Sequence, residues 1–272
     1  MSIITLLTDF GTNDEYVGLM KGAILSINPS ATIVDISHQI DRQDIGQAAL
    51  AIHSGYQYFP DGTVHAIVVD PGVGTARRLL ALRLKGHCFV APDNGVLTLL
   101  LGEGHISSLN LITNAKYFRY PVSSTFHGRD IIGPVAAHLT CGLPANELGP
   151  EIQVQNIIRL DNLLARCTDD GELIGEVAAI DHFGNLITNI RSDTLSECLE
   201  VGAPEEIRVN INSSVIKGLS ETYAGKGSNT ALALIGSRGY LEIAVNKGHA
   251  AQLLNAQKGD HVRVAVERFL KS

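Results

Sequence analysis

The pattern of apolar residues changes near the middle of this chain, and that change limits the folds open to it. In the first half, short apolar runs alternate with amphipathic stretches of helical spacing. Beyond about residue 165 there are short β-rich runs broken by glycine and asparagine. The sequence therefore predicts an α/β half followed by an all-β half, which argues for two domains.

The first half predicts a layered α/β N-terminal domain with a mostly parallel sheet. Runs such as 65–69, which lack polar alternation, are typical of strands covered on both faces. The expected elements are strands at 3–8, 32–36, 64–69, 79–84 and 88–91, and helices at 16–27, 45–58, from about 95, and 129–139.

The second half predicts an all-β C-terminal domain built as a small antiparallel barrel or sandwich. Its expected strands are 175–180, 186–190, 206–211, 230–235, 240–244 and 261–266. The polar stretch at 149–156 has the composition of a linker. We therefore place the α/β domain at 1–158 and the barrel-like domain at 165–272, with small-molecule sites expected where two such domains meet.

Composition and charge limit the kinds of molecule that we expect this chain to bind. The 272 residues carry a net charge of -7, and the pair Arg77-Arg78 is the largest basic cluster, so we expect no nucleic-acid partner. No apolar run approaches the roughly 18 residues of a membrane span, and the N-terminal stretch is unlike a signal peptide. We expect a soluble cytoplasmic protein that acts on small molecules.

The cysteines and histidines give no sign of a metal. Cys88, Cys141, Cys167 and Cys198 are scattered in apolar or helix-like contexts, and we interpret them as reduced core thiols. No HxH, HExxH or Cys/His grouping is present, so we expect no metal site.

Three loops of the first half combine charged side chains with glycine. Asp9, after the first strand, is placed to hold ribose hydroxyls, although such residues often only cap the next helix. Asp70 and Arg77 share a Pro-Gly turn, which is either a surface ion pair or a site where arginine orients a water-binding carboxylate. His127 lies beside Gly128 in a loop suited to proton transfer or water positioning, although a lone histidine is more often structural.

Two loops of the second half offer binding groups. The segment 180–185 supplies an aromatic face, an amide and a carboxylate, and the segment 236–240 supplies a serine and a guanidinium suited to a carboxylate ligand. Both are equally compatible with plain hairpin turns.

Six segments, in this order, resemble the family of S-adenosylmethionine (SAM)-dependent halogenases and hydroxide adenosyltransferases, the fluorinase- and chlorinase-like proteins. They are TDFGTND at 8–14, VVDPGVGTARR at 68–78, APDNGVLT at 91–98, FHGRD at 126–130, IDHFGN at 180–185 and GSRGY at 236–240. The resemblance spans nearly the whole chain. It implies a two-domain subunit in a homotrimer, with each site between the N-terminal domain of one subunit and the C-terminal domain of its neighbour, and with SAM as substrate and no cofactor.

The resemblance also implies roles for individual residues. Asp9 matches the acid that grips the ribose hydroxyls. The residues that match the remainder of the substrate pocket are Asp181, Phe183, Asn185, Tyr223, Ser237 and Arg238. Asp70, Arg77 and His127 match the catalytic pattern of the branch that uses hydroxide. We expect Arg77 and His127 to hold and polarise the water or stabilise developing hydroxide, with Asp70 orienting them and accepting a proton or its hydrogen bond.

Two departures from the halogenases favour water as the nucleophile. Asp70 replaces a tyrosine, and Gly128 replaces the serine that contacts halide. An ionised Asp70 would repel halide by several kcal/mol at an effective dielectric constant of ~20. We therefore expect in-line attack of activated water on the ribose C5′ of SAM, releasing adenosine and methionine. The alternatives are a halogenase, a non-catalytic sensor of adenosine or SAM, and a nucleosidase or nucleotide hydrolase.

Overall fold

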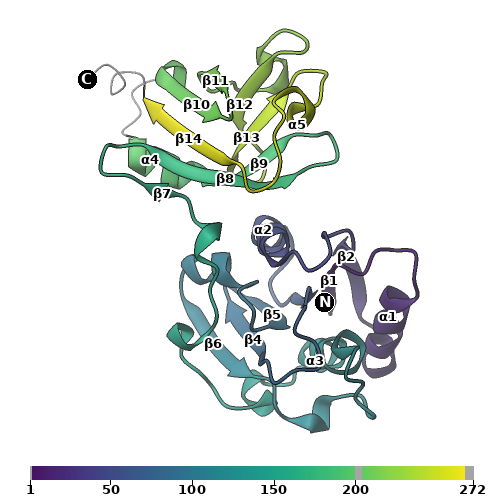
Figure 1. Ribbon diagram of the computed structural model, residues 1–272. Helices are drawn as coiled ribbons and strands as arrows, with labels where there is room; N and C mark the ends of the chain where they lie inside the picture. The colour runs from purple at the N-terminus through teal and green to yellow at the C-terminus, as the bar shows by residue number, and fades with distance from the viewer. Residues whose placement is uncertain (1, 200–203, 267–272) are drawn as a thin grey trace. The chain divides into compact units, whose positions relative to one another are not determined.

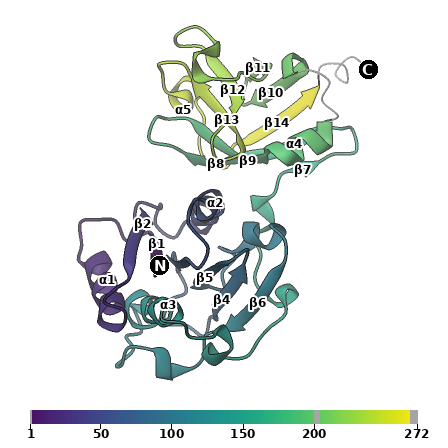
Figure 2. The ribbon, with the colours of Figure 1, turned by 180° about the vertical axis from the view of Figure 1, so that it is seen from behind.

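The computed structural model describes residues 2–199 and 204–266. The chain divides into two compact units, Met1–Leu160 (unit 1) and Asp161–Ser272 (unit 2). Figures 1 and 2 show the elements of each unit from opposite sides. Each unit has its own hydrophobic core, so each is described separately.

Unit 1 is built on one six-stranded sheet with the order β2-β1-β3-β5-β4-β6. Neighbouring strands are parallel from β2 to β5, and β4 runs antiparallel to β5 and β6. This agrees with the predicted layered domain and mostly parallel sheet. The strands are β1 (Ile3–Thr8), β2 (Thr32–Ser37), β3 (Val64–Val68), β4 (Leu79–Leu84), β5 (His87–Pro92) and β6 (Ile106–Leu111).

Helices cover this sheet because its inner strands, β1, β3, β5 and β4, are apolar and buried on both sides. The helices are α1 (Tyr16–Ile27), α2 (Ile45–Gly55) and α3 (Gly133–Thr140). Side chains of α1 and α3 share a core with Ile4 and Leu6 of β1, while α2 lies on the other side of the sheet (Figure 1). The Asp44 side chain accepts a hydrogen bond from the Gln47 N–H (2.9 Å) and so caps the start of α2.

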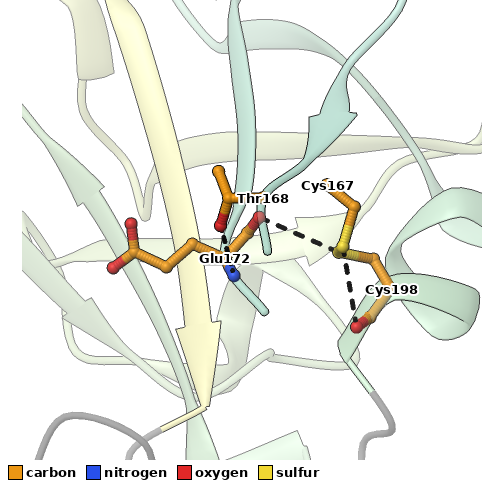
Figure 3. The surroundings of a disulfide bond; sticks show 4 residues. All are labelled: Cys167, Thr168, Glu172 and Cys198. Carbon is orange, nitrogen blue, oxygen red and sulfur yellow. Dashed lines mark hydrogen bonds between the residues drawn. A yellow bond between two sulfur atoms is a disulfide. The ribbon is translucent and has the colours of Figure 1, made fainter. Parts of the chain in front are cut away.

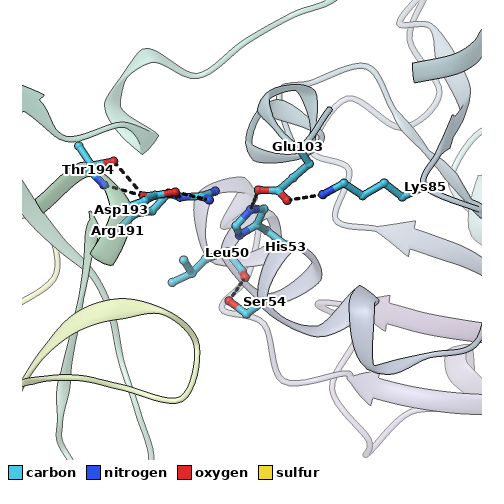
Figure 4. Close-up of polar contacts among 8 residues, drawn as sticks. All are labelled: Leu50, His53, Ser54, Lys85, Glu103, Arg191, Asp193 and Thr194. Carbon is cyan, nitrogen blue, oxygen red and sulfur yellow. Dashed lines mark hydrogen bonds and ion pairs between the residues drawn. The ribbon is translucent and has the colours of Figure 1, made fainter. Parts of the chain in front are cut away.

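Polar contacts fix the end of α2 within unit 1. His53 on α2 contacts Glu103 (Nε2 to Oε1, 2.8 Å), and Lys85 contacts the other oxygen of the same carboxylate (3.0 Å), as Figure 4 shows. The Ser54 hydroxyl donates to the Leu50 carbonyl (2.7 Å) in the last turn of the helix. These contacts tie α2 to the chain that leads into β6.

The sequence patterns failed in four places in unit 1. The helix expected from about residue 95 is only a 3-10 helix at Thr98–Gly102, and β6 was not anticipated. The helix expected at 129–139 begins as a π-helical turn at Gly128–Ile132. The proposed linker at 149–156 is also wrong: the Leu111 N–H donates to the Pro150 carbonyl and the Ile152 N–H to the Leu109 carbonyl (both 2.9 Å), so residues 150–152 extend the sheet edge, and Val154–Asn156 form a 3-10 helix.

Unit 2 is an antiparallel, nearly closed barrel-like sheet, as the sequence predicted. Its strand order is β11-β10-β14-β8-β9-β13-β12, with β7 paired to β8. A bridge between Leu219 and Ala233 brings the chain after β11 to β12. The strands are β7 (Arg166–Cys167), β8 (Leu173–Ile180), β9 (Leu186–Arg191), β10 (Ile207–Ile211), β11 (Ser214–Lys217), β12 (Ala231–Ile235), β13 (Tyr240–Val245) and β14 (His261–Val266).

Two helices accompany these strands: α4 (Ser192–Leu199), which directly follows β9, and α5 (Ala250–Leu253). The Arg191 guanidinium pairs with Asp193 (2.7 Å), and the Asp193 carboxylate accepts the Thr194 N–H (2.6 Å) in the first turn of α4 (Figure 4). None of the described helices is long and apolar enough to cross a membrane.

The interpretation of all four cysteines as reduced core thiols is wrong. Cys167 and Cys198 form a disulfide that joins β7 to α4, with their Cα atoms 5.8 Å apart (Figure 3). Cys141 is a free but exposed thiol. Only Cys88 matches the expectation: it is buried, and burial raises the pKa of its thiol to about 11.

Candidate active site

The carboxyl ends of two neighbouring strands bring the first acids together. β1 and β3 are parallel, with Thr8 opposite Val68, and Asp9 and Asp70 follow these strands within two residues. The carboxyl edge of such a sheet is where ligands gather. The Asp9 carboxylate accepts a hydrogen bond from the backbone N–H of Gln43 (2.8 Å), which fixes its orientation.

A glycine-containing turn carries the chain from Asp70 back to Arg77. The Val73 N–H donates to the Asp70 carbonyl (3.2 Å), and the Thr75 N–H and hydroxyl both donate to the Gly72 carbonyl. Gly74 has φ of 77°, and a Cβ on it would lie 2.1 Å from the Ser124 carbonyl oxygen. A side chain there would meet both backbone strain and a backbone clash, so only glycine lets this turn lie against the loop that carries His127.

Arg77 joins the other two predicted catalytic residues. Its Nε donates to both oxygens of Asp70 (2.8 and 2.7 Å), and a terminal nitrogen also contacts Asp70 Oδ2. The same terminal nitrogen lies 2.8 Å from Nδ1 of His127. The side chains of Asp70 and Arg77 are 4% and 11% exposed, so this pair is shielded from water and stronger than a surface ion pair.

This contact determines the state of the His127 ring. A guanidinium only donates hydrogen bonds, so Nδ1 must accept and Nε2 carries the proton of the neutral imidazole. Burial lowers the pKa of His127, and the positive charge of Arg77 lowers it further, against the opposing effect of Asp70 and Asp130. His127 therefore presents an N–H donor at neutral pH.

A cavity of about 220 Å³ lies at this edge of unit 1. Asp9, Asp70 and His127 line it, whereas Arg77 is not one of its lining residues and reaches Asp70 and His127 through its guanidinium. The rest of the lining is largely apolar: Phe10, Gln43, Val68, Pro71, Val73, Thr125, Phe126 and Gly128. The cavity thus combines a few polar groups with largely apolar walls.

The other charged residues of these motifs support the loops. Arg78, next to Arg77, donates through Nε to Asp93 (2.8 Å), and the Asn94 amide donates to the Val69 carbonyl (2.8 Å). The Asp130 carboxylate is fully buried, pairs with Arg129 (2.7 Å) and accepts the Ser123 N–H (2.9 Å). These contacts hold the chain on either side of Asp70 and His127.

The six binding residues predicted in the second half gather around one cavity of unit 2, of about 540 Å³. These are Asp181, Phe183, Asn185, Tyr223, Ser237 and Arg238. Asp181 accepts hydrogen bonds from the Phe183 and Asn185 N–H groups (both 2.9 Å) and from the Asn185 amide (3.0 Å). Phe183 is 74% exposed, so its ring is free to stack on a planar ligand.

Sequence reasoning missed several residues that line these cavities. Gln43 holds Asp9, and Phe10 packs edge-on against Phe126 with ring centroids 5.7 Å apart. In unit 2, Glu242 and Lys247 line the cavity. A glutamate within the apolar run of β13 was a signal for Glu242, whereas nothing in the sequence places residue 43 beside residue 9.

Comparison with known proteins agrees with this geometry. Residues 4–149 match the SAM hydroxide adenosyltransferase N-terminal domain, and residues 175–263 match the SAM hydroxide adenosyltransferase C-terminal domain. The two units of the fold thus correspond to the two domains of a class of proteins named for SAM chemistry. The chain belongs to the SAM hydroxide adenosyltransferase family.

Relatives cover the chain almost end to end. An (R)-S-adenosyl-L-methionine hydrolase of Thermus thermophilus is 37% identical over 97% of this chain and 100% of its own. A fluorinase of Actinoplanes is 32% identical, covering 96% and 97%. A solved structure of an uncharacterized conserved protein from Thermotoga maritima has a TM-score of 0.88 at 37% identity, covering 96% of this chain and 99% of its own.

Proposed function

We propose that this protein hydrolyses SAM to adenosine and L-methionine by in-line attack of water at the ribose C5′. The observation that carries this proposal is the continuous contact from Asp70 through Arg77 to His127 beside a small, largely apolar cavity. Its relatives named (R)-S-adenosyl-L-methionine hydrolase, at 34–37% identity over nearly the whole chain, support it further.

The chemistry needs a positioned nucleophile more than an acid. The sulfonium leaves as a neutral thioether, so the C5′–S bond breaks without protonation of the leaving group. Water forms the new C5′–O bond and gives up one proton. A water fixed opposite sulfur in a dry cavity gains from both orientation and the attraction between developing hydroxide and sulfonium.

The hydrogen bonds favour distinct roles for the trio. In the sequence interpretation Arg77 held the water together with His127. The cavity lining favours a different arrangement, in which the His127 Nε2–H donates to the water and Asp70 accepts its proton. Asp70 retains acceptor lone pairs beyond those used by Arg77. Arg77 is then a positioning residue that orients both neighbours.

The substrate-binding part of the proposal uses both cavities. Asp9 holds the ribose hydroxyls, and Asp181, Phe183, Asn185, Tyr223, Ser237 and Arg238 hold the remainder of SAM.

The family resemblance favours a homotrimer in which unit 1 of one subunit and unit 2 of its neighbour complete each site. Light scattering on the purified protein tests this: a mass three times that of the chain is expected, and a monomer that remains fully active would contradict it.

The names of the relatives also specify a stereoisomer of the substrate, the one with the (R) configuration at sulfur. We propose that this protein prefers the (R) epimer over the (S) epimer of SAM. Incubation of each epimer with the protein, followed by liquid chromatography, should give adenosine and methionine faster from the (R) form. Equal rates would contradict the preference.

The same chromatography separates the alternative functions. Haloadenosine formed in the presence of halide would indicate a halogenase, adenine a nucleosidase, and no turnover with tight binding a sensor. In water labelled with oxygen-18, the label should appear on the 5′ oxygen of adenosine. Unlabelled adenosine would exclude direct attack by water.

We also propose a cytoplasmic location, although disulfides such as Cys167–Cys198 are rare in reducing cytosol. Alkylation of thiols in intact cells before lysis tests this. Alkylated Cys167 and Cys198 would mean that the disulfide is reduced in the cell, as a cytoplasmic protein requires. Unmodified cysteines would favour an oxidising compartment.

A further inference from the structure

One buried acid in the unit 2 cavity has no part in the proposed reaction. Glu242 lies in the middle of β13, between Leu234 of β12 and Ile187 of β9, and it is only 6% exposed. A carboxyl group at such a position is costly unless it has hydrogen-bond partners. Its contacts therefore indicate what it does.

Glu242 faces three polar side chains and a glycine. The Tyr223 hydroxyl donates to its Oε1 (2.7 Å), and its Oε2 lies so close to Gly236 that a Cβ there would be 2.4 Å away. Arg238 and Asp181 also act on it electrostatically, in opposite directions. Gly236 thus leaves the space in which the carboxyl group sits.

The pKa values of this pair are consistent with a stable hydrogen bond. Burial raises the pKa of Glu242, while its hydrogen bond with Tyr223 acts the other way. Burial and the contact with Glu242 raise the pKa of Tyr223 to about 12. The phenol therefore keeps its proton and remains a donor throughout the neutral range.

Tyr223 lies on a segment with few other attachments. Residues 221–230 are all exposed, and the 3-10 helix Tyr223–Gly225 has no buried residue. Hydrogen bonds fasten the two ends of the segment: Ser220 N–H to the Ala233 carbonyl (2.7 Å) and Asn229 N–H to the Asn246 carbonyl (2.8 Å). Within the segment, the Asn246 amide holds the Lys226 carbonyl (2.7 Å), and Glu242 holds the Tyr223 side chain.

We propose that Glu242 is a positioning residue that latches the 221–230 segment over the unit 2 cavity, so that the Tyr223 ring forms one wall of the pocket for the substrate. Both residues line that cavity, and their hydrogen bond joins the buried strand β13 to the exposed 221–230 segment. The latch sets substrate affinity and takes no part in bond cleavage. This inference rests on the proposed function for the identity of the ligand.

The latch predicts a specific pattern of mutant effects. Glu242→Ala and Tyr223→Phe should each weaken SAM binding roughly tenfold, as expected for a lost hydrogen bond to a charged group, with kcat changed less than threefold. The double variant should be no weaker than either single one, because both remove the same bond. Glu242→Gln, which keeps an acceptor oxygen, should bind SAM nearly as well as the parent protein. Tyr58→Phe, at a tyrosine 75% exposed in unit 1, is the matched control.

Hydrogen exchange tests the latch without any substrate. Amides of residues 221–230 should exchange faster in Glu242→Ala and Tyr223→Phe than in the parent protein, while amides of β13 stay protected. Unchanged exchange in this segment would overturn the inference. So would a double variant whose loss of affinity is the product of the losses in the two single variants.

Failure of the latch and failure of the proposed function give different results. Calorimetry with SAM and with adenosine measures binding independently of turnover. Binding without turnover, with the mutant pattern above, would reject the reaction and keep the latch. Turnover with unaltered affinity in Glu242→Ala would reject the latch and keep the reaction, and a parent protein that binds neither ligand would reject both.

Discussion

At the scale of single residues, two adjacent arginines have different roles. Arg77 joins Asp70 to His127, whereas Arg78 pairs with Asp93 and donates to the Asn156 carbonyl. The sequence shows only a basic dipeptide. Their partners in the structure distinguish the arginine at the candidate site from the one that holds a neighbouring loop.

Because the two arginines have different partners, the same substitution at each should have different effects. Arg77→Lys keeps the charge but loses the forked contact with Asp70 and the hydrogen bond to His127, so kcat should fall about 100-fold or more. Arg78→Lys makes the same chemical change one residue away and should alter kcat less than threefold. Steady-state kinetics on SAM measures both. Similar losses in the two variants would mean that Arg77 acts only through stability.

His65 allows a prediction about pH and stability. It is fully buried, contacts Thr5 (2.7 Å) and His87 (3.1 Å), and burial lowers its pKa from 6.5 to about 3. In the unfolded chain, His65 is therefore protonated below about pH 6.5, whereas in the folded protein it stays neutral until about pH 3. As the pH is lowered through that range, the free energy of unfolding should fall by on the order of 5 kcal/mol from this group.

Unfolding in urea at several pH values measures this effect. His65→Phe keeps the stack on Phe89 and should flatten the dependence between pH 6.5 and 3. His105→Asn, at an exposed histidine of the same unit, should leave it unchanged. Equal slopes in both variants and the parent would show that other groups cause the acid sensitivity.

At the scale of elements, the turn at 70–77 sets the distance between the loops that carry Asp70 and His127. Gly74→Ala should lower turnover at least tenfold, because the new methyl group would meet the Ser124 carbonyl and push apart the loops that carry Asp70 and His127. Backbone strain at positive φ adds about 1 kcal/mol of lost stability. Turnover and the midpoint of thermal unfolding are the measurements.

Gly62→Ala separates strain from displacement. Gly62 also has positive φ, 86°, but a Cβ there has no heavy atom within 4 Å. This variant should lose similar stability from strain alone and keep full turnover. A loss of turnover in Gly62→Ala as large as that in Gly74→Ala would contradict the role given to the turn.

Sequence reasoning worked where an element follows from local pattern. The limits of β1, α1 and β14 agree with their apolar runs, and the loops after β1 and β3 were identified because charged residues interrupt those runs. It failed where long-range contacts decide. Nothing local distinguishes Gly149–Asn156 from a linker until β6 supplies a partner, and nothing in the spacing of Cys167 and Cys198 shows that β7 and α4 meet.

At the scale of the whole molecule, two cores predict two unfolding events. The disulfide closes a loop of 31 residues within unit 2, and chain entropy assigns such a loop about 3–4 kcal/mol. A reductant should therefore lower the unfolding temperature of unit 2 and leave that of unit 1 unchanged. Calorimetry with and without dithiothreitol, followed by hydrogen exchange to assign each transition, measures this.

The serine variant Cys198→Ser provides the control. It should reproduce the effect of the reductant, and adding reductant to it should have no further effect. Cys141→Ser, at the free exposed cysteine of unit 1, should change neither transition. A single transition that shifts as a whole would show that the two cores unfold cooperatively.

The distribution of residues over separate cavities has a consequence for protein engineering. Asp70, Arg77 and His127 lie on unit 1, and the residues assigned to the larger part of SAM lie on unit 2. Under the proposed function, unit 1 therefore selects the nucleophile and unit 2 binds the larger part of the substrate. A chimera that joins unit 1 of a fluorinase relative to unit 2 of this protein should use the nucleophile of the fluorinase. Its specificity among sulfonium substrates should be that of this protein.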